Sequence, residues 1–222
     1  MADFPFDIVA FDLDGTLLET HRDLGTAVNH ALTLGGFASF PLETATDLIG
    51  GGAKVMLRRA IDDQGGLDDD RFHTLYKAML AYYGENYAVH TSPYPGAVAM
   101  LEALAGRGVK LAVVTNKFEN FAKGVLAALG LDQHFQIIVG GDSLGKGRAK
   151  PAPDLIWHVQ QACGGGSLAF VGDSSYDMKA ARAARVPVVA ACYGYCDQSA
   201  QELGADAAID SLDQLITALE TL

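Results

Sequence analysis

Residues 8–16 read Ile-Val-Ala-Phe-Asp-Leu-Asp-Gly-Thr, and the fold prediction starts from this stretch. Its first four residues form a short apolar run, which is typical of a parallel β-strand covered by helices on both faces. Two carboxylates, Asp12 and Asp14, follow at once, and Gly15 allows the chain to turn sharply after them. The stretch therefore predicts a buried strand that ends in acidic side chains.

Further apolar runs predict the rest of a sheet, and segments with helical periodicity separate them. The runs cover residues 109–114, 135–139, 168–171, 186–191 and a weaker 207–209. Leu155, Ile156 and Val159 mark one of the helical faces. Because strands and helices alternate, we expect an α/β fold, a doubly wound parallel sheet of Rossmann-like type.

The long segment between the first two predicted strands reads as helix throughout. Its expected helices lie at 24–34, 54–62 and 71–87, separated by glycine pairs and a glycine triplet. A crossover between parallel strands normally needs one helix, so the extra helices predict an inserted domain. We expect residues 1–18 and 91–222 to form the α/β core and residues 19–90 to form a helical cap domain.

The composition excludes several classes of function. The 222 residues are 50% hydrophobic, and 16 Lys and Arg against 27 Asp and Glu give a net charge of −11. Such a chain repels nucleic-acid backbones and anionic membrane surfaces. The three cysteines lack structural-zinc spacing, and the chain shows no secretory signal or membrane-spanning run. We expect a cytoplasmic monomer or homodimer that acts on a small molecule.

Polar residues follow the predicted strands where each strand ends. Thr115-Asn116-Lys117 follows the second strand, Lys150 lies in the loop after the third, and Gly172-Asp173 through Asp177 follows the fourth. Ligands of open parallel sheets bind outside the carboxyl ends of the strands. Together with Asp12 and Asp14, these groups predict one site at one edge of the sheet.

The order of these motifs resembles the haloacid dehalogenase superfamily of phosphotransferases, over nearly the whole chain. Its signature is Asp-x-Asp-Gly-Thr, then Ser or Thr, then Lys, then Gly-Asp-x-x-x-Asp. The resemblance implies that Asp12 attacks phosphorus to form an aspartyl-phosphate. It also implies that Asp14 protonates the leaving oxygen and then takes a proton from water.

The remaining motif residues would bind the phosphoryl group. Thr115 would hold its non-bridging oxygens together with the turn at Gly15 and Thr16. Lys150 would neutralise the transferring group and orient Asp12.

The charge of this site calls for a cation. Several carboxylates and a phosphate dianion face a single lysine, and this cluster would repel its substrate. Oxygen ligands beside a phosphate favour Mg²⁺ over zinc. By resemblance, the ligands are Asp12, the backbone carbonyl of Asp14 and Asp173, with Asp177 either a direct ligand or hydrogen-bonded behind the ligands.

Within the superfamily, the chain is most similar to the phosphoglycolate phosphatases. The similar segments are residues 11–17, 23–24, 49–52, 59–60, 94–96, 115–117, 140–144, 150–153 and 193–195. This similarity implies hydrolysis of 2-phosphoglycolate to glycolate and phosphate. Because that substrate carries a carboxylate of its own, we expect nearby groups to bind it, and the candidates are Asn116, Lys117, Lys54 and Arg59.

Other functions use related motifs. A phosphatase of another small sugar phosphate, or a phosphosugar mutase, would carry the same four motifs. A non-hydrolytic phospho-Asp signalling module also uses an Asp, a Thr and a Lys, but it is smaller and lacks the insert. Residues 140–147 nearly match a nucleotide-binding P-loop, but no Ser or Thr follows Lys146.

Overall fold

A computed structural model describes residues 4–49 and 51–222 of the chain. The described chain divides into two compact units. One comprises the chain up to Glu19 together with Pro93–Leu222, and the other comprises Thr20–Ser92. A short strand, β2 (Leu18–Glu19), pairs with β3 (Ser92–Pro93) where the chain passes between the units. The role of the second unit as a cap domain stays a prediction.

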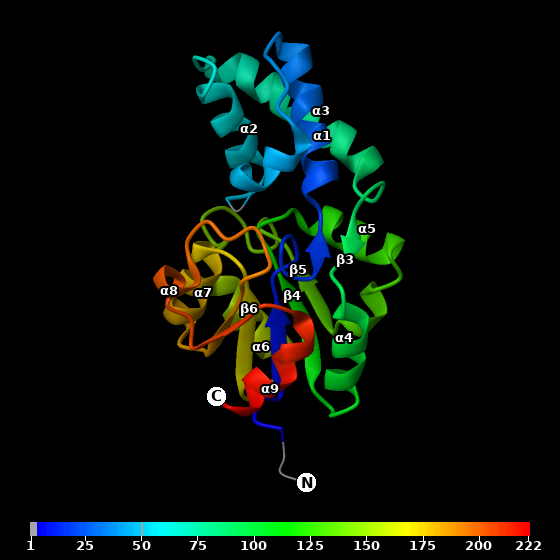
Figure 1. Cartoon of the computed structure of the whole chain (residues 1–222), viewed down its shortest axis with the longest axis vertical. Helices are drawn as coiled ribbons and strands as arrows, with labels where there is room; N and C mark the ends of the chain where they lie inside the picture. The colour runs from blue at the N-terminus through cyan, green and yellow to red at the C-terminus, as the bar shows by residue number, and fades with distance from the viewer. Residues whose placement is uncertain (1–3, 50) are drawn as a thin grey trace. The chain divides into compact units, whose positions relative to one another are not determined.

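The first unit is built on a parallel sheet, as predicted (Figure 1). Within the described residues it has six strands in the order β5-β4-β1-β6-β7-β8. The strands are β1 (Ile8–Phe11), β4 (Lys110–Val114), β5 (Ile137–Val139), β6 (Leu168–Gly172), β7 (Val188–Ala191) and β8 (Ala207–Ile209). All neighbouring strands run parallel, which confirms the predicted fold class.

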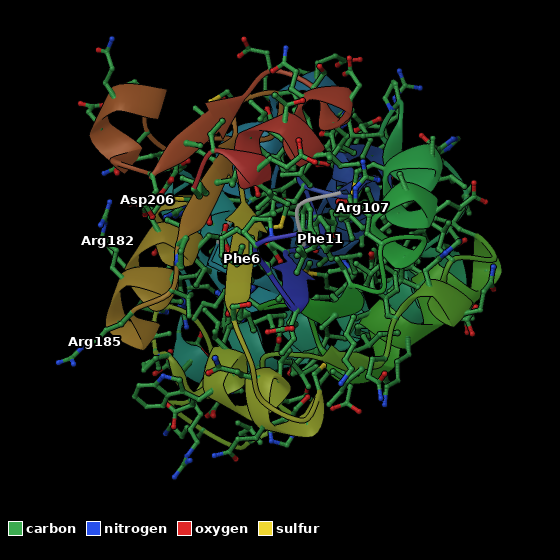
Figure 2. All side chains as sticks on the ribbon, turned by 90° about the horizontal axis from the view of Figure 1, so that it is seen from below. Phe6, Phe11, Arg107, Arg182, Arg185 and Asp206 are labelled. Atoms are coloured by element: carbon green, nitrogen blue, oxygen red, sulfur yellow. The ribbon has the colours of Figure 1, made fainter. Side chains whose placement is uncertain are left out.

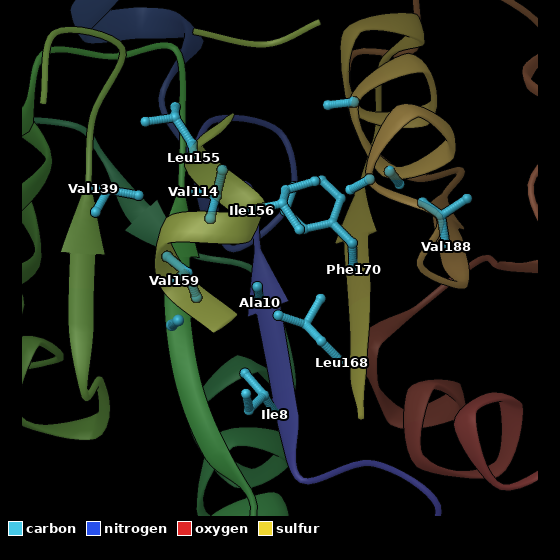
Figure 3. Packing of buried hydrophobic residues seen from close by; sticks show 14 of the residues in the cluster. Ile8, Ala10, Val114, Val139, Leu155, Ile156, Val159, Leu168, Phe170 and Val188 are labelled. Carbon is cyan, nitrogen blue, oxygen red and sulfur yellow. The ribbon is translucent and has the colours of Figure 1, made fainter. Parts of the chain in front are cut away.

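Helices cover both faces of this sheet, which explains why its strands are apolar throughout. On one face, α6 (Asp154–Ala162) and α7 (Ser175–Ala184) pack in a buried cluster with residues of β1, β4 and β6 (Figure 3). On the other, α4 (Ala97–Ala105) and α9 (Leu215–Glu220) contact the strands and one another. Figure 2 shows the red C-terminal helices and the yellow-green α6 on opposite sides of the strands.

Short elements complete the first unit. They are α5 (Glu119–Ala128), α8 (Ala200–Leu203) and the 3₁₀ helices η2 (Asp132–His134) and η3 (Leu212–Gln214). Among the described residues, none of the helices has the length and hydropathy that a bilayer span requires.

The second unit is helical. It contains α1 (His21–Gly35), the 3₁₀ helix η1 (Leu42–Leu48), α2 (Ala53–Asp62) and α3 (Asp69–Asn86). The three predicted helices are confirmed to within a few residues, whereas η1 was not predicted because a short 3₁₀ segment carries no clear apolar period. Helix α1 contacts α2, α3 and η1, and Leu32 of α1, Leu57 of α2 and Phe72 of α3 are fully buried.

A buried carboxylate holds the two ends of the second unit together. Asp23, in the first turn of α1, is 3% exposed. It accepts hydrogen bonds from the His90 amide and from both the amide and the hydroxyl of Thr91, over 2.8–3.1 Å. Every donor lies within the same unit, so this charge has a local structural role.

Candidate active site

The register of three neighbouring strands brings the predicted site residues together. Phe11 of β1 is paired with Val113 of β4 on one side and with Val171 of β6 on the other. The residues that follow these positions therefore leave the sheet side by side, about 5 Å apart. This register places Asp12 between the segment that carries Thr115 and the segment that carries Asp173.

An acidic cluster forms at this edge around one lysine. Asp12, Asp173 and Asp177 each offer a carboxylate oxygen, and these oxygens lie within 4.8 Å of one another. The Lys150 ammonium lies 2.9 Å from Asp12 Oδ1 and 2.6 Å from Asp177 Oδ1. All four side chains are buried, so their charges act on one another with little screening by solvent.

The electrostatics of the cluster follow from this burial. Burial raises the pKa of Asp12 to about 6, an effect that the Lys150 charge opposes and the Asp177 charge strengthens. Burial also raises the pKa of Asp173 well above its ordinary value, and the charges of Asp177 and Asp12 add to the rise. Burial alone would lower the pKa of Lys150, but the charges of Asp12 and Asp177 outweigh it and raise that pKa. One lysine therefore leaves the carboxylates incompletely compensated.

The residues fit a hard divalent cation. Asp12 Oδ1 is buried and has no hydrogen-bond donor in good geometry within the described part of the chain, although the Lys150 charge lies close by. Asp173 accepts one bond on each oxygen, from the Thr16 hydroxyl at 3.0 Å and from the Tyr195 amide at 2.8 Å. Each Asp173 oxygen thus keeps a further lone pair. Clustered carboxylate oxygens of this kind are the ligands that Mg²⁺ prefers.

Asp177 is more fully engaged than the other two carboxylates. Its Oδ2 accepts bonds from the Ser174 amide at 3.0 Å and the Ser174 hydroxyl at 2.6 Å, and its Oδ1 accepts the bond from Lys150. Gly172 makes room for it, because a Cβ at Gly172 would overlap the Asp177 carboxylate. The chief effect of Asp177 in this geometry is to hold Lys150 beside Asp12.

Asp14 is paired with Lys117 and not with Lys150. Lys117 Nζ donates to both Asp14 oxygens at 2.8 Å, and the Lys117 side chain is 4% exposed. Lys117 was predicted to contact the substrate, whereas here its ammonium orients Asp14. Its predicted contact with the substrate stays a prediction.

The turn after β1 is built against Asp173. Gly15 has φ +84°, and a Cβ at this position would overlap Asp173 Oδ2. The Thr16 hydroxyl donates to Asp173, so it holds a carboxylate in this structure. Thr115 is buried, and its hydroxyl oxygen accepts a bond from the Lys117 amide at 3.2 Å. The roles of these residues in phosphate binding stay predictions.

The segment that nearly matches a P-loop instead supports the neighbouring loop. A Cβ at Gly141 would lie 2.8 Å from the Asn116 carbonyl oxygen, so glycine permits the close approach. Asp142 accepts a bond from the Glu119 amide at the start of α5, at 2.8 Å. The Asn116 side-chain amide in turn donates to the Lys150 carbonyl at 3.1 Å. These contacts link the loops that carry Thr115 and Lys150.

The two remaining predicted residues lie in the other unit. Lys54 and Arg59 are both on α2, and both are exposed. The neighbouring Arg58 is engaged within the unit, since its guanidinium lies 3.6 Å from the centre of the Phe72 ring and bonds Asp69 at 2.8 Å. Lys54 and Arg59 therefore stay candidates for substrate binding.

Several residues around the cluster were not predicted. Ser174 stands three residues before Asp177, a spacing typical of a helix N-terminus that could have identified it. Tyr193 and Asp197 follow β7 and contact the site through Thr16 and Ser175. No sequence pattern assigns them a partner, because these contacts depend on how separate loops meet.

Comparison with known proteins agrees with this geometry. Residues 9–191 match the haloacid dehalogenase-like hydrolase family. The phosphoglycolate phosphatase of Agrobacterium fabrum is 36% identical over 214 residues, which are 96% of this chain and 91% of that protein. The phosphoglycolate phosphatase of Nitrosospira multiformis is 39% identical over 213 residues, covering 94% and 93% of the two chains.

A solved structure agrees as well. A protein described as a predicted phosphoglycolate phosphatase from Haemophilus somnus superimposes with a TM-score of 0.88 at 33% identity, covering 96% of this chain and 97% of that one. Sequence and structure thus match over almost the full length of both chains. The chain belongs to the haloacid dehalogenase-like hydrolase family.

Proposed function

We propose that this enzyme is a Mg²⁺-dependent phosphomonoester hydrolase that works through an aspartyl-phosphate on Asp12, with 2-phosphoglycolate as its substrate. One observation carries the proposal. Carboxylate oxygens of Asp12, Asp173 and Asp177 lie within 4.8 Å of one another at the carboxyl edge of the sheet, and Lys150 forms ion pairs with Asp12 and Asp177. An anionic substrate can bind such a cluster only when additional positive charge is present.

In the first step, a carboxylate oxygen of Asp12 attacks phosphorus while the bond from phosphorus to the ester oxygen breaks. Lys150 holds Asp12 in place and offsets negative charge as it moves onto the phosphoryl oxygens. A divalent cation held by Asp12, the Asp14 carbonyl and Asp173 would add further charge compensation. The leaving oxygen takes a proton from Asp14.

In the second step, water attacks the phosphorus of the acyl phosphate, and the bond from phosphorus to Asp12 breaks. Asp14, by then a carboxylate, takes the proton of that water. The Lys117 ammonium holds Asp14 in place, because it donates a hydrogen bond to each of the two oxygens.

The relatives support the choice of substrate. The curated proteins reported above are named phosphoglycolate phosphatases and match more than nine-tenths of the chain. A substrate with both a phosphate and a carboxylate needs cationic groups beyond Lys150. Lys117, Lys54 and Arg59 are the proposed partners of its carboxylate.

The test is phosphate release from a panel of esters, with and without Mg²⁺, by the wild type and Asp12→Asn. The proposal expects turnover that needs Mg²⁺, a preference for 2-phosphoglycolate, and at least about a 1,000-fold loss in Asp12→Asn. Isomerised sugar phosphate would identify a mutase, and a long-lived phosphoprotein without turnover would identify a signalling module. If 2-phosphoglycolate is among the poorest esters, the proposed substrate is wrong.

A second variant isolates the proton transfer. Asp14→Asn should strongly slow the first step with 2-phosphoglycolate, whose leaving alkoxide needs a proton, and slow it much less with an aryl phosphate. Rapid-quench measurement of the phosphoenzyme reports that step alone. Equal losses with both esters would contradict the role of Asp14 as a general acid.

A further inference from the structure

The loop after β7 makes contacts with three different parts of the candidate site. The Tyr193 hydroxyl donates to the Thr16 carbonyl at 2.7 Å, and the Tyr195 amide donates to Asp173 Oδ2 at 2.8 Å. Asp197 accepts bonds from the amide and the hydroxyl of Ser175 at 2.7 and 2.6 Å. We call residues 193–197 the β7 loop.

The β7 loop lies directly against the turn that follows β1. A Cβ at Gly194 would overlap the Gly15 carbonyl oxygen and would lie 2.5 Å from the Asp173 Cβ. Only glycine allows this approach, and Gly15 faces Asp173 in the same way. Small displacements of the β7 loop must therefore move the Gly15 turn or the Asp173 side chain.

These contacts determine the orientation of the Asp173 carboxylate. Its two oxygens accept one bond each, from the Thr16 hydroxyl and the Tyr195 amide, and these two donors fix the plane of the group. Thr16 is itself held by the bond that Tyr193 makes to its carbonyl. The Tyr193 hydroxyl thus acts on Asp173 through Thr16.

The Tyr193 hydroxyl is suited to a permanent structural bond. Its ring packs edge to face against Tyr94, with ring centres 4.9 Å apart. Burial and the nearby charge of Asp173 raise the pKa of this hydroxyl, so it stays protonated and remains a donor. Removal of the hydroxyl alone would leave the packed ring in place.

We propose that Tyr193 is a positioning residue for divalent-cation binding, which acts by holding Thr16 and, through it, the Asp173 carboxylate in the orientation that binds the ion. The inference rests on the proposed function for the identity of the ion. It adds a residue and a loop that lie outside the four sequence motifs.

The test compares the wild type with Tyr193→Phe in a calorimetric titration of the metal-free protein with Mn²⁺ and Mg²⁺. Loss of one buried hydrogen bond predicts a rise of about 10-fold in the dissociation constant. The KM for the phosphate ester at saturating Mg²⁺ should change less than twofold, and kcat should recover as Mg²⁺ is raised. Tyr82→Phe is the matched control, because the Tyr82 ring also packs against an aromatic ring, that of His30 in the other unit. The affinity of Tyr82→Phe for the ions should equal that of the wild type.

Cation affinity in Tyr193→Phe within twofold of the wild type would overturn the inference, and so would a wild type that binds neither ion. A loss of kcat that high Mg²⁺ does not restore would also overturn it. The proposed function fails separately, if the wild type binds the cation in a Tyr193-dependent way yet releases no phosphate from any ester.

Discussion

Each of the two units contains a buried carboxylate, Asp23 in one and Asp12 in the other, and the groups that compensate the two charges differ. In the helical unit, Asp23 is surrounded by donors from His90 and Thr91 of that same unit. In the α/β unit, Asp12 has a buried oxygen with no well-placed hydrogen-bond donor among the described residues, and its compensation is the charge of Lys150, shared with Asp177. A buried charge with a full set of local donors stabilises a fold, whereas one left short of donors has capacity for a ligand.

The same difference distinguishes a carboxylate that stabilises the fold, Asp23, from one that is available to a ligand, Asp12. Burying a charge without full compensation costs stability, and a protein retains such a group where the charge has a use. The raised pKa values of Asp12 and Asp173 express that cost. The following predictions test whether the contrast between Asp12 and Asp23 holds.

The largest effect is expected from Lys150→Met. The variant keeps a long side chain but leaves Asp12 and Asp177 without their shared cation, so we expect a loss of about 3–5 kcal/mol in unfolding free energy at neutral pH. The loss should shrink as the pH falls below about 6 and Asp12 takes up a proton. Denaturant unfolding of the metal-free protein over a range of pH measures it. A stability equal to the wild type at every pH would mean that Lys150 does not compensate the cluster.

Asp12→Asn should instead stabilise the metal-free protein at neutral pH. Because burial raises the pKa of Asp12 to about 6, the folded state holds this proton where the unfolded state has lost it. The contribution of Asp12 to stability therefore falls as the pH rises from about 4 to about 6, and it stays low above that range. Relative to the wild type, Asp12→Asn should gain on the order of 2–3 kcal/mol between pH 4 and pH 7.

Mg²⁺ provides the control for this prediction. It should raise the unfolding temperature of the wild type and leave that of Asp12→Asn nearly unchanged, because binding to the folded state alone is stabilising. Parallel pH profiles for the two proteins in the absence of metal would contradict the raised pKa.

Asp23→Ala should destabilise the protein by about 2 kcal/mol, because it leaves the buried donors of Thr91 without an acceptor. Amide hydrogen exchange should speed up at residues 90 and 91 and in α1, and should be unchanged in β1 and β6. A loss of phosphate release at saturating substrate, with stability intact, would show that Asp23 is a functional residue and would break the contrast.

Arg58 and Arg59 test the same contrast on one helix, with the smallest expected effects. Arg58→Ala loses its contacts with Phe72 and Asp69 and should cost about 1 kcal/mol of stability. Arg59→Ala should change stability by less than about 0.5 kcal/mol, because the side chain is exposed. If Arg59 binds the substrate carboxylate, its loss should raise KM several-fold and leave kcat unchanged in steady-state assays.

Much of the α/β unit could be predicted because local pattern and local structure agree there. The apolar runs at 8–11 and 168–171 became β1 and β6, since a strand buried on both faces needs apolar residues at every position. The two-residue strands β2 and β3 were not predicted, because so short a segment carries no periodicity. The 3₁₀ helix η1 was missed for the same reason.

Which charged side chains pair with one another was harder to predict from the sequence than which residues lie at the strand ends. Lys117 and Asp14 lie 103 residues apart in sequence, and no spacing indicates that this lysine bonds that carboxylate. Thr16 was expected at the phosphate, whereas its hydroxyl donates to Asp173. Both contacts depend on the register of adjacent strands and on the course of the loops beyond them.

The amino-acid order was sufficient to identify the parallel sheet, the helical insert and the set of acidic and basic residues at the strand ends, because each follows from short-range periodicity or from residue type. The folded arrangement was needed to show that Lys150 forms ion pairs with Asp12 and Asp177. It was also needed to show that Lys117 is hydrogen-bonded to Asp14 and that the β7 loop donates a hydrogen bond to Asp173. Those partnerships join side chains from separate loops, and their free energy depends on distances and burial that arise when the strands align.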